Sequence, residues 1–129
     1  MLKLSFCLRR LPHLSREAFQ DYWLNQHGPL VQRHAQALRI RRYLQLHSLD
    51  DTLTAGLRKA RGAPEPYDGV AELWFDSVED LTAARHDKAA RAAGAALIED
   101  ERKFIDLANS PLWLAEEHPI FERGPRRGT

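Results

Sequence analysis

The stretch GVAELWFDSVEDL, residues 69–81, contains the clearest strand of the chain and the start of a helix. Gly69 and Ser77 bound the strand, whose residues are mostly apolar or aromatic. Ser77 is a good N-cap, and Asp80 occupies the position from which a side chain reaches back in a capping box. The stretch therefore predicts a β–α unit, around which the rest of the fold can be arranged.

Three further strands are predicted on either side of this unit. LKLSFCLR at 2–9 alternates leucine or phenylalanine with other residues, which is the period of a strand with one strongly apolar face. RIRRYLQLHS at 39–48 alternates again, and PLWLAEEHPI at 111–120 predicts a last strand ended by Pro119.

Helices are predicted between these strands. Ser15 stands at an N-cap position, so a helix is expected from about residue 16, with an apolar stripe at i, i+3 and i+4 spacing. The alanine-rich stretch 81–108 is helical by propensity, and we expect a break at Gly94 or in the charged cluster 99–102. Residues 50–69 show little periodicity and predict a long loop with room for one helical turn.

The order of these elements decides the fold class. Strand, helix, strand, loop, strand, helices and strand form the βαββαβ arrangement of a ferredoxin-like α+β fold, an antiparallel sheet with its helices on one face. Both faces of strands 39–48 and 69–76 carry large apolar or aromatic groups, so the second face needs a cover. We expect a homodimer in which two sheets close into a dimeric α+β barrel.

Composition limits the class of protein. The 129 residues suffice for one domain, expected over residues 1–121, and residues 122–129 form a short basic tail expected to be disordered. With 19 Lys and Arg against 18 Asp and Glu, no charge excess favours nucleic acid. The single cysteine, Cys7, cannot form an internal disulfide, and no apolar run is long enough for a signal peptide or a membrane span. A cytoplasmic location is expected.

Several motifs occur in an order that resembles the EthD family of dimeric α+β barrel proteins. The resemblance covers residues 2 to about 121, and no single motif carries it. It implies a ferredoxin-like protomer, a barrel-forming dimer and a small-molecule cavity between sheet and helices. It also implies chemistry on small organic compounds, including decarboxylation or dehydration of aromatic polyketides without metal or organic cofactor. The motifs are LSREAFQDYWLNQHGPLV (14–31), RRYLQLH (41–47), YDGVAELWFDSVEDL (67–81), EDERKFID (99–106) and EEHPIF (116–121).

The first helix contains the principal catalytic candidate. Pro29 lacks an N–H and its ring clashes with the preceding turn, so the helix must end, kink or restart there. His27 then lies at the break, where the helix dipole favours its cation and burial favours its neutral form. Its pKa is expected near 7, suitable for a general acid or base, although a buried imidazole that satisfies loose carbonyls is an equally good interpretation.

The strand predicted at 39–48 contains polar residues that are candidates for a ligand-binding site. Tyr43, Gln45 and His47 share one face, a pattern that favours a lined cavity over an aliphatic core, with a polar dimer interface as the alternative. We expect His47 to be catalytic with His27, and Tyr43 and Gln45 to bind substrate. The other predicted substrate-binding residues are Trp23, Trp74, Phe104 and His118.

Other polar residues have structural interpretations. Asp68 is expected to stabilise a turn, and Asp100 is expected to form ion pairs on a charged helix surface. No metal site is predicted, because His27 and His34 lie too far apart to share one ion. The leading hypothesis is a cofactor-independent lyase or isomerase acting on a small aromatic or carbonyl compound. The alternatives are a non-catalytic protein that binds a hydrophobic metabolite and, less favoured, a heme protein with His27 as ligand.

Overall fold

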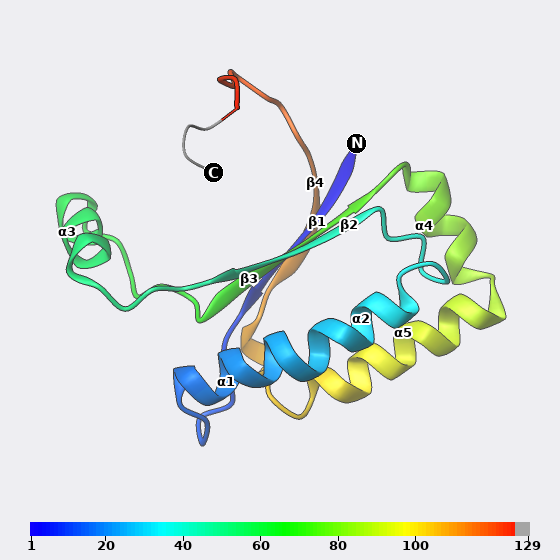
Figure 1. Cartoon of the computed structure of the whole chain (residues 1–129), viewed down its shortest axis with the longest axis horizontal. Helices are drawn as coiled ribbons and strands as arrows, with labels where there is room; N and C mark the ends of the chain where they lie inside the picture. The colour runs from blue at the N-terminus through cyan, green and yellow to red at the C-terminus, as the bar shows by residue number, and fades with distance from the viewer. Residues whose placement is uncertain (126–129) are drawn as a thin grey trace.

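The computed structural model describes residues 1–125 and contains one four-stranded sheet in the order β2-β3-β1-β4 (Figure 1). All neighbouring strands are antiparallel. The four predicted strands are therefore confirmed, with the last one shorter than expected. Their bounds are β1 (Leu2–Leu8), β2 (Arg42–His47), β3 (Gly69–Phe75) and β4 (Leu112–Glu116).

Helices cover one face of this sheet (Figure 1). The first connection contains α1 (Arg16–Tyr22), a π-helical turn η1 (Trp23–His27) and α2 (Gly28–His34), which follow one another without interruption. The second contains α4 (Val78–Arg85), α5 (Lys88–Glu101) and a short 3₁₀ turn η2 (Leu107–Asn109). This is the ferredoxin-like α+β fold predicted from the order of elements.

Both predicted helix starts have the expected caps. The Ser15 hydroxyl accepts a hydrogen bond from the Ala18 N–H, and the Ser77 hydroxyl accepts one from the Asp80 N–H. Each bond satisfies one of the N–H groups that a helix leaves unpaired at its start.

The expectation of a long loop at 50–69 is wrong. A ten-residue helix, α3 (Thr52–Arg61), occupies this segment. Asp51 caps its start by accepting from the Thr54 N–H, and Gly62 ends it in the left-handed conformation. Local capping was present in the sequence, and Leu53 and Leu57 have helical spacing, but the helix packs no residue into the core.

The break expected at Gly94 is wrong, but the one expected in the charged cluster 99–102 is confirmed, because α5 ends at Glu101. The chain turns at His86 and Asp87, between α4 and α5, and Gly94 lies inside α5. The side chain of Asp87 accepts from the Ala89 N–H and so caps the start of α5. A cap thus outweighs the low helix propensity of one interior glycine.

The core lies between the sheet and the first helix. Phe19 packs against Trp23 and Phe104 with ring centroids 5.7 and 5.5 Å apart. Phe6 and Leu8 reach this cluster from β1. The apolar stripe predicted for the first helix is therefore the one that faces the sheet.

The opposite face of the sheet has no helix on it (Figure 1). Trp74 lies there between the Lys3 ammonium and the Arg42 guanidinium, 4.5 and 4.6 Å from the ring. Leu46 on β2 and Trp113 on β4, the two edge strands of the sheet, stay exposed. We call this surface the open face.

Residues 117–125 contain no helix or strand. The predicted tail at 122–129 lies in part outside the described residues, which end at 125, and its boundary with the domain stays a prediction. Over residues 1–125, no helix has the length and apolar character that crossing a bilayer requires.

Candidate functional site

The break predicted at Pro29 is a π-helical turn. Pro29 has no N–H to donate, and the N–H of Gly28 bonds to the carbonyl of Trp23, one residue further back than in an α-helix. The helix then restarts as α2 with Pro29 in its first turn. The wider turn places His27 toward the interior, where it is 4% exposed.

His27 pairs with a carboxylate from α5. Its Nδ1 lies 2.7 Å from Oδ2 of Asp100, and the Tyr22 hydroxyl donates to the other carboxylate oxygen at 2.6 Å. An ionised Asp100 can only accept, so the proton of a neutral His27 is assigned to Nδ1. Nε2 then carries a free lone pair, and it has no hydrogen-bond partner within residues 1–125.

The pKa values of both His27 and Asp100 are lowered, which suits a buried base that is hydrogen-bonded to a carboxylate. Burial lowers the pKa of His27 from its ordinary value, although Asp100 opposes the shift. Burial would raise the pKa of Asp100, but hydrogen bonds from Tyr22 and His27 outweigh it and lower that pKa. At neutral pH the pair is therefore a neutral imidazole on an ionised carboxylate.

Tyr43, Gln45 and His47 do share the helix-facing side of β2. The Gln45 amide donates to the Tyr43 hydroxyl at 2.8 Å and to the Trp23 carbonyl at 2.9 Å. Its oxygen lies 2.8 Å from Nε2 of His47. Since Gln45 donates to Tyr43, the hydroxyl proton of Tyr43 stays available for another acceptor.

A small cavity of about 40 Å³ lies between the sheet and the helices. His27, Tyr43 and a third titratable residue, Glu101, all line it. A larger apolar cavity of about 400 Å³ adjoins it along α5. The residues that line both are Phe6, Leu73, Leu97 and Glu101.

Glu101 is the most unusual acid of the site. Burial, aided by the charge of Asp100, raises its pKa to about 7. A carboxyl group with that pKa is partly protonated at neutral pH and can give or take a proton. His27, Tyr43 and Glu101 therefore line one small cavity, and the carboxyl group among them has a pKa near neutrality.

The structure brings only some of the predicted residues together. Trp23 lines the small cavity and stacks on His47 with centroids 4.6 Å apart, and Phe104 packs on His27 at 5.1 Å. His47 and Gln45 instead line a wider groove of about 690 Å³ beside α2. His27 and His47 therefore do not face one cavity.

Two predicted residues lie away from this cavity. Trp74 is on the open face, where its indole N–H donates to Glu117, and its neighbour Leu73 is the residue on the helix side. His118 is exposed and lies 3.9 Å from Glu116. Strand pleating explains the position of Trp74, since successive side chains point to opposite faces, whereas His118 lies beyond the end of β4.

Sequence reasoning missed the two acids of α5. We expected Asp100 on a charged surface, but it is buried against His27, and Glu101 was not singled out at all. A signal was present: Asp100 stands three residues after the buried Leu97, on the stripe that also contains Ala90 and Ala93. A carboxylate on the buried stripe of a helix needs a partner in the core.

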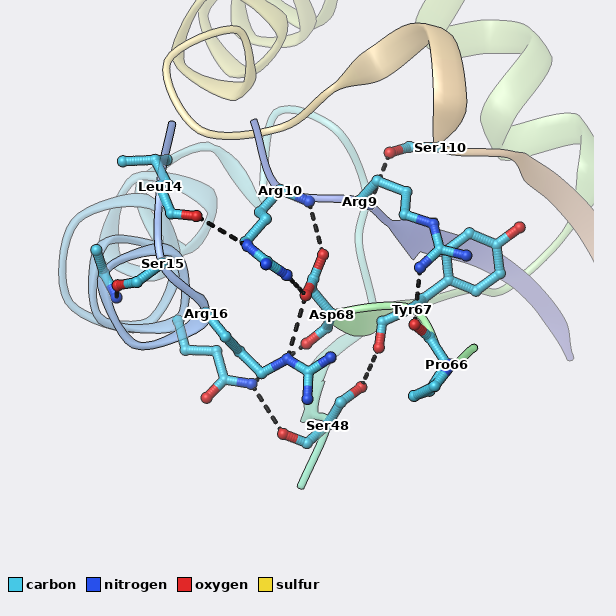
Figure 2. Close-up of polar contacts among 12 residues, drawn as sticks. Arg9, Arg10, Leu14, Ser15, Arg16, Ser48, Pro66, Tyr67, Asp68 and Ser110 are labelled. Carbon is cyan, nitrogen blue, oxygen red and sulfur yellow. Dashed lines mark hydrogen bonds and ion pairs between the residues drawn. The ribbon is translucent and has the colours of Figure 1, made fainter. Parts of the chain in front are cut away.

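A second buried carboxylate has a structural role (Figure 2). Asp68, 2% exposed, accepts from the backbone N–H of Arg10 at 2.9 Å and from the Arg16 guanidinium at 3.1 Å. Gln20 donates to the carbonyls of Ser48 and Asp68. These bonds join the ends of β1 and β2 to α1, in agreement with a non-catalytic interpretation of Asp68.

The comparisons with known proteins come from a family model and from solved structures. The EthD domain model matches residues 11–108. No curated protein matches the chain.

Solved structures agree with the fold. An ethyl tert-butyl ether D (EthD) family protein from Bacillus halodurans is 19% identical, with 92% of this chain and 100% of that chain covered and a TM-score of 0.59. An EthD-like protein from Ralstonia eutropha is 20% identical, with 97% and 96% covered and a TM-score of 0.59. A dimeric ferredoxin-like protein of unknown function from Bacteroides fragilis is 11% identical, with 90% and 95% covered and a TM-score of 0.56.

Proposed function

The chain belongs to the EthD family, and on that premise we propose that it is a cofactor-independent lyase or isomerase that moves protons on a small carbonyl or aromatic compound. One observation carries the proposal: His27, Tyr43 and Glu101 line one small cavity that adjoins a large apolar one. Perturbed acids and bases that share a cleft are typical of sites for proton transfer.

The apolar cavity binds the body of the substrate. At about 400 Å³ it falls within the usual range for small-molecule sites, roughly 300–1,000 Å³. Its walls are mostly aliphatic, from α4, α5 and the sheet, so burial of apolar surface drives binding. The polar end of the substrate then enters the small cavity, with its carbonyl oxygen accepting from Tyr43.

Proton abstraction falls to His27. Its free Nε2 takes a proton from the carbon next to the carbonyl group, and the Tyr43 O–H stabilises the negative charge that develops on oxygen. Asp100 acts through His27, because its hydrogen bond to Nδ1 holds the ring in the required tautomer and stabilises the imidazolium.

Glu101 completes the reaction as an acid. In an isomerisation, its carboxyl group delivers a proton to a different carbon of the enolate. In a dehydration, it protonates the departing hydroxyl group, which leaves as water. In both reactions the substrate gains the proton that Glu101 loses. After product release His27 loses the proton on Nε2 and Glu101 gains one, which restores the starting state.

Asp100 also contacts a groove outside the site. Together with Tyr22 and Lys103 it lines a groove of about 450 Å³ on the outer side of α2 and α5. His27, on the other side of Asp100, lines the inner cavity. Asp100 therefore lies between the His27 ring and a groove on the outer side of the helices.

Deuterium incorporation tests this proposal without knowledge of the natural substrate. A library of small cyclic and aromatic ketones is incubated with the protein in D₂O, and exchange at carbon is detected by mass spectrometry. We expect exchange for at least one ligand, and its loss in His27→Gln and Glu101→Gln. Glu99→Gln is the matched control, because Glu99 is exposed on the same helix.

A non-catalytic binding protein is the second candidate. The almost wholly apolar lining of the larger cavity is the observation that favours it. Ligands that raise the melting temperature but show no exchange at carbon, with equal binding to wild type and to His27→Gln, would support binding and contradict catalysis.

A heme site does not fit His27. The space that His27 faces is about 40 Å³, far below the volume that a macrocycle needs. Phe104 also packs on the His27 ring, with the centroids 5.1 Å apart. Within residues 1–125, no three His, Cys, Asp or Glu side chains gather as ligands for a metal ion.

We also propose that the protein is a homodimer formed through the open face. Leu46 and Trp113 are exposed there, and the Bacteroides fragilis protein of this fold is described as dimeric. Burial of these side chains against a second sheet would remove apolar surface from water. Sedimentation of wild type and Trp113→Glu tests this: we expect a two-chain mass and its loss in the variant, and a single-chain mass for wild type at micromolar concentration would contradict it.

A further inference from the structure

Helix α3 presents an apolar stripe that nothing in the chain covers. Leu53 and Leu57 are 77% and 61% exposed, and Leu49 precedes them at the same spacing. Leu53 and Leu57 lie at i and i+4, which places them on one helix face, while Leu49, 69% exposed, lies just before the N-cap Asp51. No residue of α3 is buried. We call this face the leucine stripe.

The segment after β4 presents the second uncovered apolar surface. Ile120 and Phe121 are 87% and 81% exposed, within residues 117–122 that we call the arm. Glu117 holds the start of the arm on the open face through Trp74. Figure 1 shows the arm leaving the sheet on the side away from α1, α2 and α5. Adjacent exposed apolar side chains of this size mark a contact surface.

The two surfaces are complementary in charge. Helix α3 has Arg58, Lys59 and Arg61 in its last turn and no acidic residue within it. The arm contains two acidic residues, Glu117 and Glu122, and Arg123 follows it. An acidic segment with an apolar centre thus matches a basic helix with an apolar face, a pairing that gives specificity and steers association.

We propose that the arm of one protomer docks on the leucine stripe of a second copy of this chain. Within one chain both surfaces stay bare, and Figure 1 shows α3 beyond one end of the sheet, apart from the arm. In a two-fold dimer the contact occurs twice, since each protomer supplies one arm and one stripe. This inference rests on the proposed homodimer and adds to it a contact between the arm of each protomer and the leucine stripe of its partner.

Cross-linking between two labelled chains tests the contact. In a Cys7→Ser background, a chain with Leu57→Cys and a chain with Phe121→Cys are co-expressed under different affinity tags and treated with a short bis-maleimide. We expect a cross-linked pair carrying both tags. Val78→Cys replaces Leu57→Cys in the control, because Val78 is also exposed but lies at the start of α4.

Each other outcome overturns the inference in a distinguishable way. A two-chain mass in sedimentation with no mixed cross-link leaves the dimer standing and removes the arm contact. A single-chain mass removes both. A Leu57→Cys, Phe121→Cys double variant that links within one chain shows that the arm covers its own α3.

A second set of variants avoids cysteine chemistry. Ile120→Ser with Phe121→Ser in the full chain should raise the dimer dissociation constant about tenfold or more, as removal of buried apolar anchors does. Leu53→Ser with Leu57→Ser should do the same, and combining the two sets should add little because they remove one contact. Val78→Ser should leave the constant unchanged. Additive effects of the two sets would contradict the proposal.

Discussion

The Nδ1 of His27 lies 2.7 Å from the carboxylate of Asp100, although 73 residues separate them in the sequence. One comes from a π-helical turn and the other from the end of α5. The two groups stabilise each other: the Asp100 carboxylate fixes the tautomer of His27, and the hydrogen bond from His27 helps to keep the buried Asp100 ionised.

Asp100→Asn should disturb the chemistry more than the fold. Without the carboxylate the proton can move to Nε2, so turnover of an exchanging ligand should fall by roughly 10²–10⁴-fold. The pKa of His27 should fall further, because Asp100 is what raises it. Nitrogen-15 shifts of the ring check the tautomer directly. A wild-type ring protonated on Nε2 would contradict the assignment, and Glu99→Gln is the control.

Glu101 should make the protein less stable as pH rises. Its pKa is raised in the folded state from 4.5 to about 7, so the folded protein binds more protons than the unfolded chain between these values. The free energy of unfolding should therefore fall between about pH 4.5 and 7, by up to about 3 kcal/mol at roughly 1.4 kcal/mol per pKa unit.

Urea unfolding of wild type and Glu101→Gln at pH 5 and pH 8 measures this effect. Glu101→Gln should remove most of the decrease, because an amide does not titrate. An unchanged decrease in Glu101→Gln would assign it to another group.

Gly69→Ala should destabilise the protein. A Cβ there would lie 2.4 Å from Cζ3 of Trp23 and 2.9 Å from the Leu46 carbonyl oxygen, so the core must shift. We expect a loss of about 1–3 kcal/mol in the free energy of unfolding, as for other overpacked cores. A Cβ at Gly56, inside α3, would have nothing within 4 Å, so Gly56→Ala should raise the free energy of unfolding by about 0.5–1 kcal/mol. A neutral Gly69→Ala would show that Trp23 can move.

Asp68→Asn should lower the free energy of unfolding by about 3–5 kcal/mol, because Arg10 and Arg16 lose the buried carboxylate that they pair with. Burial raises the pKa of Asp68, but the hydrogen bonds of Arg10 and Arg16 outweigh it and lower that pKa. The stabilisation is therefore present above the ordinary pKa of an aspartate and is lost as pH falls through the lower folded value.

Unfolding of Asp68→Asn at pH 7 and pH 3 checks both parts, with a smaller acid sensitivity expected in the variant. Asp76→Asn is the control, because its contact with Arg41 at 3.8 Å is exposed and should contribute about 1 kcal/mol or less. Equal decreases in the free energy of unfolding for the two variants would mean that the Asp68 carboxylate does not stabilise the junction of β1, β2 and α1.

Local patterns determined most of the fold. Alternation located the four strands, and Ser15 and Ser77 located two helix starts, because these signals depend on neighbours within a few residues. The same reasoning identified His27 and the shared face of Tyr43, Gln45 and His47. It missed α3, whose capping residues are clear but whose leucines face away from the core.

The sequence by itself thus determined the order of elements, the fold class and the break in the first helix. Only the tertiary structure decided which side chains meet: Asp100 with His27, Glu101 on the wall of two cavities, Trp74 on the opposite face from Tyr43. The physical reason is that periodicity records whether a residue faces inward, while its partner and its pKa depend on segments that the sheet and helix packing bring together from far along the chain.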